Sequence, residues 1–88
     1  MTTFNKVPIG EEFTSEDCPG AVIKKIGEHL NNKGKMYNAI VVGAVDDETV
    51  DKLTELGICN GFKCRFYDDN IVTYPMEGVA VVSKFKED

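Results

Sequence analysis

The chain has no tryptophan, one histidine, three cysteines and no long apolar run. A transmembrane helix needs about 20 consecutive apolar residues, so none is expected and no membrane partner is predicted. The first residues, Met1–Lys6, carry no apolar segment, and we therefore expect no signal peptide. An odd number of cysteines without a secretory signal is typical of reduced thiols. The sequence thus predicts a cytoplasmic protein.

Motifs that specify a reaction are also lacking, because the chain has no Walker sequence, dinucleotide fingerprint or metal-binding loop. Adjacent carboxylates such as Asp46-Asp47 and Asp68-Asp69 are more typical of helix caps and turns than of an acid–base pair. A nucleophilic cysteine would need His29 beside it, and His29 lies in a segment that we expect to be an exposed strand end or turn. The sequence therefore predicts a non-enzymatic protein without a cofactor.

Four residues, Cys18, His29, Cys59 and Cys64, could in principle supply zinc ligands, and a structural zinc ion would stabilise a domain this small. The spacing does not match a zinc knuckle, because Cys18 and His29 are eleven positions apart and Cys59 and Cys64 are five apart. Cys64 also falls on the apolar face of a predicted strand, where a free thiol behaves as a small hydrophobe. We therefore predict no metal site and no disulfide, with the thiols buried or idle.

The charge balance limits the kinds of partner that we expect. The 88 residues include 15 acidic and 10 basic side chains, for a net charge of −5. An acidic balance argues against nonspecific nucleic-acid binding, which depends on neutralising phosphates. Lysines nevertheless cluster at Lys24, Lys25, Lys33 and Lys35. This cluster is either a local anion-binding patch or a solvated strand-and-turn surface.

One helix is predicted, between Asp47 and Leu56. Asp46 or Asp47 can cap its N-terminus, because a carboxylate accepts a hydrogen bond from the free N–H groups of the first turn. Gly57 can take the left-handed conformation that ends a helix. The apolar residues that fall close to one helical face are Val50, Leu53 and Leu56.

The rest of the chain has strand character. Apolar and polar residues alternate through Phe62–Tyr67, which is typical of a strand with one solvated face. The other predicted strands are Ala21–Ile26, Met36–Val45, Ile71–Tyr74 and Gly78–Phe85. This order predicts a single α+β, mostly β, domain over residues 1–88. We expect a small, SH3-like, partly open β-barrel of about five strands with one inserted amphipathic helix.

The predicted core follows from these elements. It takes the inward-facing residues of the strands together with the apolar face of the helix. Its members are Phe13, Val22, Ile40, Val42, Leu53, Leu56, Phe62, Phe66, Val72 and Val81.

Four segments follow one shared pattern: Phe4–Thr14, Lys25–Glu28, Tyr37–Ile40 and Cys64–Pro75. In these segments the chain resembles a group of short bacteriophage-encoded accessory proteins of unassigned function. The segment Val42–Phe62, which carries the helix, departs from the pattern. The resemblance implies a viral protein of the bacterial host cytoplasm that acts in host takeover or against defence, by binding and modulating or inhibiting a host or defence component. The helix would then be an addition on which a specific partner could dock.

A second resemblance leads to different biology. The segment Leu53–Gly61 is similar to the helix-to-strand corner of the SH3-like accessory proteins of bacterial ferrous-iron transport, although Asn31–Val45 is longer than the loop expected there. It implies an accessory module of an iron transporter or a metal-responsive regulator. A third alternative is a minor virion structural protein.

Two sets of residues are candidate contact sites. Glu48, Asp51 and Glu55 concentrate negative charge on the exposed face of the helix, where they could meet a basic site on a host or defence protein or could keep the protein soluble. A small anionic ligand, such as a nucleotide signal held between subunits of a homo-oligomer, is the variant hypothesis. Its contacts would be Lys24, Lys25, Lys35 and Arg65.

Overall fold

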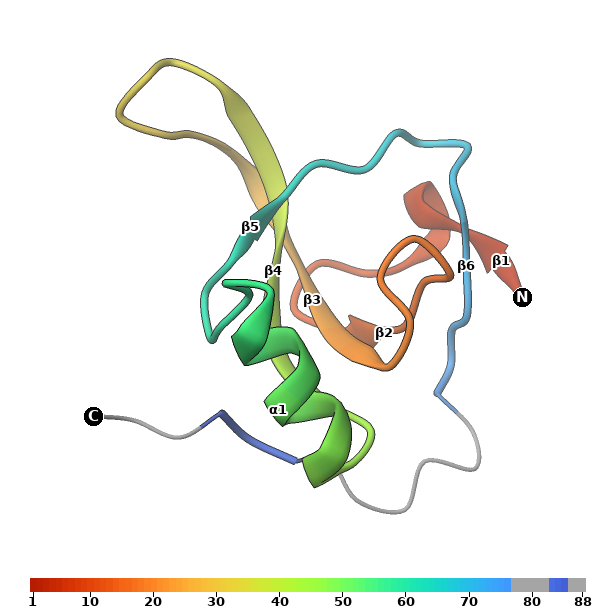
Figure 1. Ribbon diagram of the computed structural model, residues 1–88. Helices are drawn as coiled ribbons and strands as arrows, with labels where there is room; N and C mark the ends of the chain where they lie inside the picture. The colour runs from red at the N-terminus through yellow and green to blue at the C-terminus, as the bar shows by residue number, and fades with distance from the viewer. Residues whose placement is uncertain (77–82, 86–88) are drawn as a thin grey trace.

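The computed structural model describes residues 1–76 and 83–85, and in this part of the chain most regular structure is β-strand. Figure 1 shows β3 and β4 as a long hairpin whose tip extends away from the body, with α1 beside its other end. The elements are β1 (Thr2–Thr3), η1 (Phe4–Lys6), β2 (Glu12–Phe13), β3 (Ala21–Leu30), β4 (Met36–Ala44), α1 (Asp47–Glu55), β5 (Lys63–Cys64) and β6 (Ile71–Val72).

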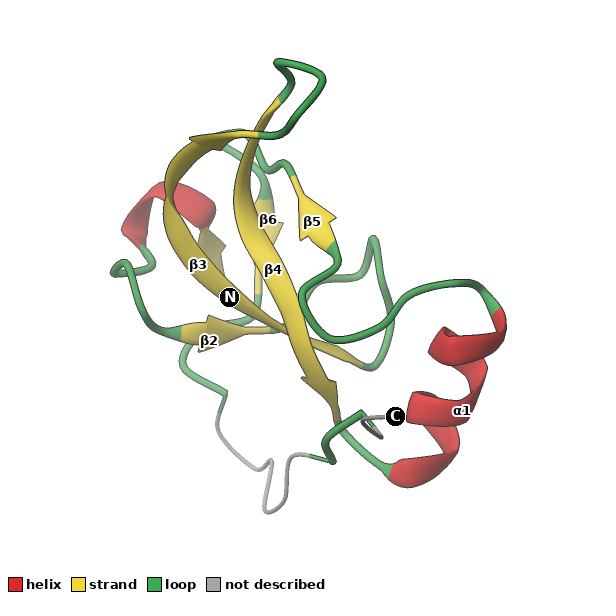
Figure 2. Cartoon of the chain, turned by 90° about the vertical axis from the view of Figure 1, so that its left-hand side faces the viewer, coloured by secondary structure: helices red, strands yellow, loops and turns green. Residues whose placement is uncertain are grey.

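The strands form two antiparallel sheets. The larger has the order β2-β3-β4-β5, and the smaller pairs β1 with β6. An isolated bridge between Thr14 and Thr73 links the two sheets, and Figure 2 shows β6 behind the larger sheet. The mostly β fold with one helix is confirmed. The described strands are not closed into a barrel, however, because the sheets meet through this bridge rather than through a continuous ladder.

The β3–β4 hairpin is longer than predicted, because β3 continues past Ile26 to Leu30. Its pairing is irregular between Lys25 and His29, where the register shifts. The turn is stabilised by Asn31, whose Oδ1 accepts hydrogen bonds from the backbone N–H groups of Lys33 and Lys35. Side chain-to-backbone bonds of this kind are typical of turns. The turn therefore lies at the end of a longer strand than predicted.

Three phenylalanines from separate segments pack together at the centre of the core. The ring centroids of Phe4 and Phe66 are 5.2 Å apart, and Phe13 meets them edge-on at 5.6 Å and 5.3 Å. Such edge-to-face and offset pairs contribute beyond the area that they bury. Five predicted core residues are confirmed as buried: Phe13, Val22, Leu53, Phe66 and Val72.

Three core predictions, Ile40, Val42 and Phe62, were wrong, and a fourth was not tested. Ile40 and Val42 are only half-buried, because side chains alternate along β4 and these two face away from buried Val41. Phe62 is 43% exposed, since it lies in the loop before β5. Val81 lies outside the described residues.

Leu56 was also assigned wrongly to the core, and it is 75% exposed. The helix ends at Glu55, and Gly57 then turns the chain with φ +82°. This turn brings Ile58 back, so that its N–H donates to the Leu53 carbonyl at 2.8 Å and its side chain packs on the core. Ile58 therefore occupies the place expected for Leu56.

Two predicted strands, Phe62–Tyr67 and Ile71–Tyr74, are shorter in the structure. Of Phe62–Tyr67, only Lys63–Cys64 is strand. Of Ile71–Tyr74, Ile71–Val72 is strand and Thr73 makes the isolated bridge to Thr14. The segment Gly78–Phe85 lies largely outside the described residues, and its Ser83 exchanges two backbone hydrogen bonds with Ala44 at 2.8 Å and 2.7 Å.

Candidate functional site

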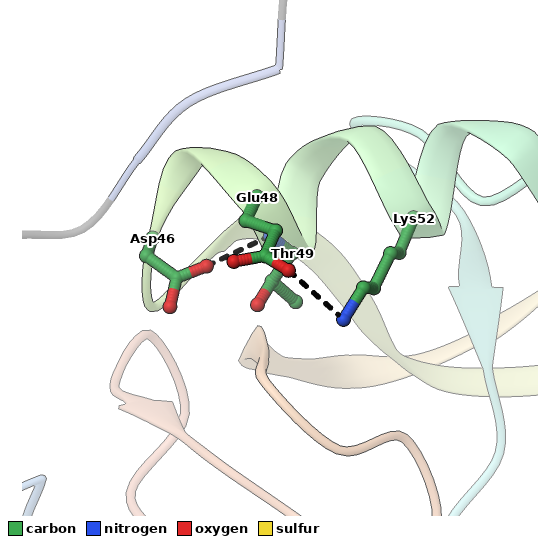
Figure 3. Close-up of polar contacts among 4 residues, drawn as sticks. All are labelled: Asp46, Glu48, Thr49 and Lys52. Carbon is green, nitrogen blue, oxygen red and sulfur yellow. Dashed lines mark hydrogen bonds and ion pairs between the residues drawn. The ribbon is translucent and has the colours of Figure 1, made fainter.

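Helix α1 is built by local signals at both ends. Asp46 has extended backbone and its Oδ1 accepts a hydrogen bond from the Thr49 N–H at 2.7 Å (Figure 3). Hydrogen bonds from Thr49 lower the pKa of the Asp46 carboxyl, and the side-chain bond contributes more than the backbone bond. Val50 and Leu53 hold the helix on the body, because both are buried in the core. The predicted helix and its cap are confirmed.

The three acidic residues proposed as a partner site lie together on this helix. Glu48, Asp51 and Glu55 are exposed and follow the i, i+3, i+7 spacing of one helical face, whereas Val50 is buried. We call these three residues the acidic face. Lys52 makes an ion pair with Glu48, at 3.3 Å between Nζ and Oε1, and both side chains are largely exposed (Figure 3). Exposed pairs of this kind contribute little to stability.

The four cations proposed as anion contacts do not gather in one place in the described structure. The Lys25 ammonium donates to the Phe4 carbonyl at 3.0 Å and lies 4.5 Å from the Phe4 ring centroid, so it is engaged within the fold. Lys35 is at the hairpin turn, whereas Lys24 pairs with Ile40 in the body of the sheet. The Arg65 guanidinium lies over the exposed ring of Tyr67.

Lys24 does line a cavity of about 310 Å³. Lys84 and Asn60 share this cavity, and both could contact an anion. The carboxylate of Glu12 lies in the same lining and opposes such a ligand. Because this carboxylate offsets part of the positive charge of the two lysines, we expect the cavity to bind an anion only weakly.

The four residues that were considered as zinc ligands do not come together as a set. Cys18 and Cys64 line one cavity, Cys59 is exposed, and His29 lies at the far end of β3, stacked on Tyr37 at 5.5 Å. Within residues 1–76 and 83–85, no three His, Cys, Asp or Glu side chains are placed to hold a metal ion. Burial, and secondarily the charge of Cys18, raises the pKa of Cys64 to about 11, and burial raises the pKa of Cys18. Both groups are therefore thiols at neutral pH.

A groove beside α1 was missed by sequence reasoning. Two adjoining cavities of about 510 Å³ and 310 Å³ share Asp17, Cys18 and Ile58 in their walls. The exposure of Leu56 and Phe62 is the signal that identifies this groove, but the sequence pattern assigned both residues to the core. We call it the α1 groove, and its apolar lining includes Cys18, Leu53, Leu56, Ile58, Phe62 and Cys64.

Comparison of the chain with protein-family models, curated proteins and solved structures found no match in any of the three. Over the described residues, no helix has the length and apolar character needed to cross a membrane.

Proposed function

We propose that this chain is a small, non-enzymatic bacteriophage accessory protein that acts in the host cytoplasm by binding a host or defence protein. The observation that carries the proposal is the acidic face, in which three exposed carboxylates project from a helix that the buried residues Val50 and Leu53 hold in place. A rigid helix presents its charges in a fixed arrangement, so little ordering is needed when a partner binds. In this proposal, the two sheets that are linked at Thr14–Thr73 form the scaffold for the helix, as an open version of an SH3-like barrel.

The partner would offer a basic surface to the acidic face. Opposite potentials steer two proteins together and raise the association rate, and this effect weakens as salt screens the charges. Lys52 neutralises part of the face through Glu48, which leaves Asp51 and Glu55 as the carboxylates without an ion-pair partner among the described residues. We therefore expect Asp51 and Glu55, in the second half of α1, to supply most of the electrostatic attraction that raises the association rate.

Affinity capture from a host lysate, followed by mass spectrometry of both proteins and small molecules, is the first experiment. The proposal predicts a host protein that is retained by the wild-type chain and released by moderate salt. The decisive control is a variant with Glu48, Asp51 and Glu55 changed to lysine, compared with a charge-matched variant at the exposed residues Glu11, Glu16 and Asp69. Equal capture by both variants would remove the acidic face as the binding site, and recovery of a small anion alone would favour the ligand hypothesis.

A further inference from the structure

We propose that the α1 groove is a second docking site, which binds an extended acidic peptide segment of a partner through two apolar anchor side chains. This site lies beyond the acidic face and uses different residues. Its two cavities have walls from the segment around Cys18, from the second half of α1 and from the chain that enters β5. Because Asp17, Cys18 and Ile58 border both cavities, one bound segment can fill both.

The interior of the groove suits apolar side chains. One cavity reaches the core, since its wall includes Ile23, Val41 and Phe66, which are buried. The other is walled by Leu53 and Ile58, and Ile58 packs against the same core. Protein-binding sites commonly have such apolar pockets at the centre, where a few anchor side chains supply most of the binding free energy.

The mouth of the groove carries large apolar side chains in contact with solvent. Leu56 is 75% exposed at one cavity, and Phe62 is 43% exposed at the other. Both belong to the connection between α1 and β5. A contiguous exposed apolar surface with a polar rim is typical of a protein interaction site.

The charge of the rim identifies the occupant. Lys52, Lys63 and Arg65 line the groove together with one carboxylate, Asp17, although the whole chain has a net charge of −5. Among the described residues, neither Lys63 nor Arg65 has a carboxylate at ion-pair distance, and each lies 5.2 Å from a tyrosine ring centroid. Lys52 is already paired with Glu48. A complementary segment therefore places one apolar anchor in each cavity and carries its acidic residues at the Phe62 end, beside Lys63 and Arg65.

Selection from a random peptide library displayed on filamentous phage tests this proposal with the full-length protein. The expected result is enrichment of sequences with two apolar residues next to acidic residues. A synthetic peptide of the enriched sequence should shift the NMR signals of Cys18, Leu53, Ile58 and Phe62. Its affinity, measured by fluorescence anisotropy, should fall about tenfold or more in the variant Lys63→Glu/Arg65→Glu.

Matched controls separate the groove from general surface effects. Leu56→Lys should abolish binding, whereas Ile9→Lys should not, because Ile9 is 70% exposed and lines neither cavity of the groove. Lys33→Glu/Lys35→Glu, at the hairpin turn, is the charge-matched control for Lys63→Glu/Arg65→Glu. The variant with a reversed acidic face should bind the acidic peptide at least as tightly as the wild type does, because it adds positive charge near the groove and frees Lys52 from Glu48. Failure of the proposed function and failure of this inference are therefore distinguishable.

Three outcomes overturn the proposal. The first is enrichment of basic peptide sequences, or the same enrichment when the selection is repeated with the Leu56→Lys variant as the target. The second is a peptide whose NMR shifts map outside the groove. The third is self-association in sedimentation experiments that Leu56→Lys abolishes and that the selected peptides do not displace, since the occupant would then be a second copy of the chain.

Discussion

The side chain of Asn38 pairs with the backbone of Phe66 across the core. Asn38 Nδ2 donates to the Phe66 carbonyl at 2.8 Å, and the Phe66 N–H donates to Asn38 Oδ1 at 2.9 Å. Both residues are 7% exposed. The amide thus satisfies both backbone groups of a residue beyond the end of β5, while the Phe66 ring stacks on Phe4.

Replacing Asn38 should destabilise the fold strongly. Asn38→Ala leaves a buried N–H and a buried carbonyl without partners, and each unsatisfied group costs about 1–3 kcal/mol. We expect a loss of at least about 2 kcal/mol in the free energy of unfolding, measured by urea denaturation. The control is Asn32→Ala at the exposed hairpin turn, which should change stability by less than about 0.5 kcal/mol. Similar values for the two variants would show that the amide pair does not stabilise the core.

The helix should depend on Leu53 and not on Leu56. Leu53 is 4% exposed and Leu56 is 75% exposed, although both are leucines of the same segment. Leu53→Ala should cost on the order of 2–5 kcal/mol, because it leaves a cavity between α1 and the sheet. Leu56→Ala should fall within about 0.5 kcal/mol of the wild type. The measurement is thermal denaturation of the two variants side by side. A larger loss of stability for Leu56→Ala than for Leu53→Ala would contradict the packing of Leu53 in the core.

The contact between Gly20 and helix α1 gives a third prediction. Gly20 has φ +82°, and a Cβ added there would lie 2.5 Å from the Thr49 Cγ2. Gly20→Ala therefore combines left-handed backbone strain, which costs about 1–2 kcal/mol, with a steric clash. Gly10→Ala is the matched control, because Gly10 has φ +95° and no atom within 4 Å of an added Cβ. We expect Gly20→Ala to be more destabilising than Gly10→Ala in urea unfolding. Adding Thr49→Ala should remove the part of the loss that comes from the clash, and the loss from backbone strain should remain.

Alkaline pH should destabilise the protein through Cys64. Burial raises the pKa of this thiol to about 11 from an ordinary value of 9.0, so the unfolded chain loses the proton first as the pH rises. The unfolded state then binds fewer protons than the folded state, and the free energy of unfolding decreases between pH 9 and about 11. Cys64→Ala should make this decrease shallower, and Cys59→Ala, at an exposed thiol, is the control. An unchanged slope in Cys64→Ala would contradict the assignment.

The sequence predicted the features that are encoded locally. The cap at Asp46 and the turn at Gly57 lie next to the helix that they bound, and helical periodicity alone places Glu48, Asp51 and Glu55 on one face. The contact between Asn38 and Phe66 joins residues 28 positions apart, so no local pattern reports it.

The α1 groove could not be predicted for a similar reason. Its walls bring Cys18 and Cys64 together from separate segments. Apolar character also does not distinguish a core residue from an exposed residue at a groove, which is why Leu56 and Phe62 were assigned wrongly.

The association rate of the captured partner with the acidic-face variant tests the central claim most directly. Stopped-flow or surface-binding kinetics would compare the wild type, Glu48→Lys/Asp51→Lys/Glu55→Lys, and the charge-matched variant at Glu11, Glu16 and Asp69, at low and high salt. If the acidic face binds a basic partner, the first variant associates more slowly at low salt and shows a weaker salt dependence, because steering is lost. The fold should survive, since the buried face of α1 is unchanged. An association rate at low salt equal to that of the wild type would contradict the proposed function.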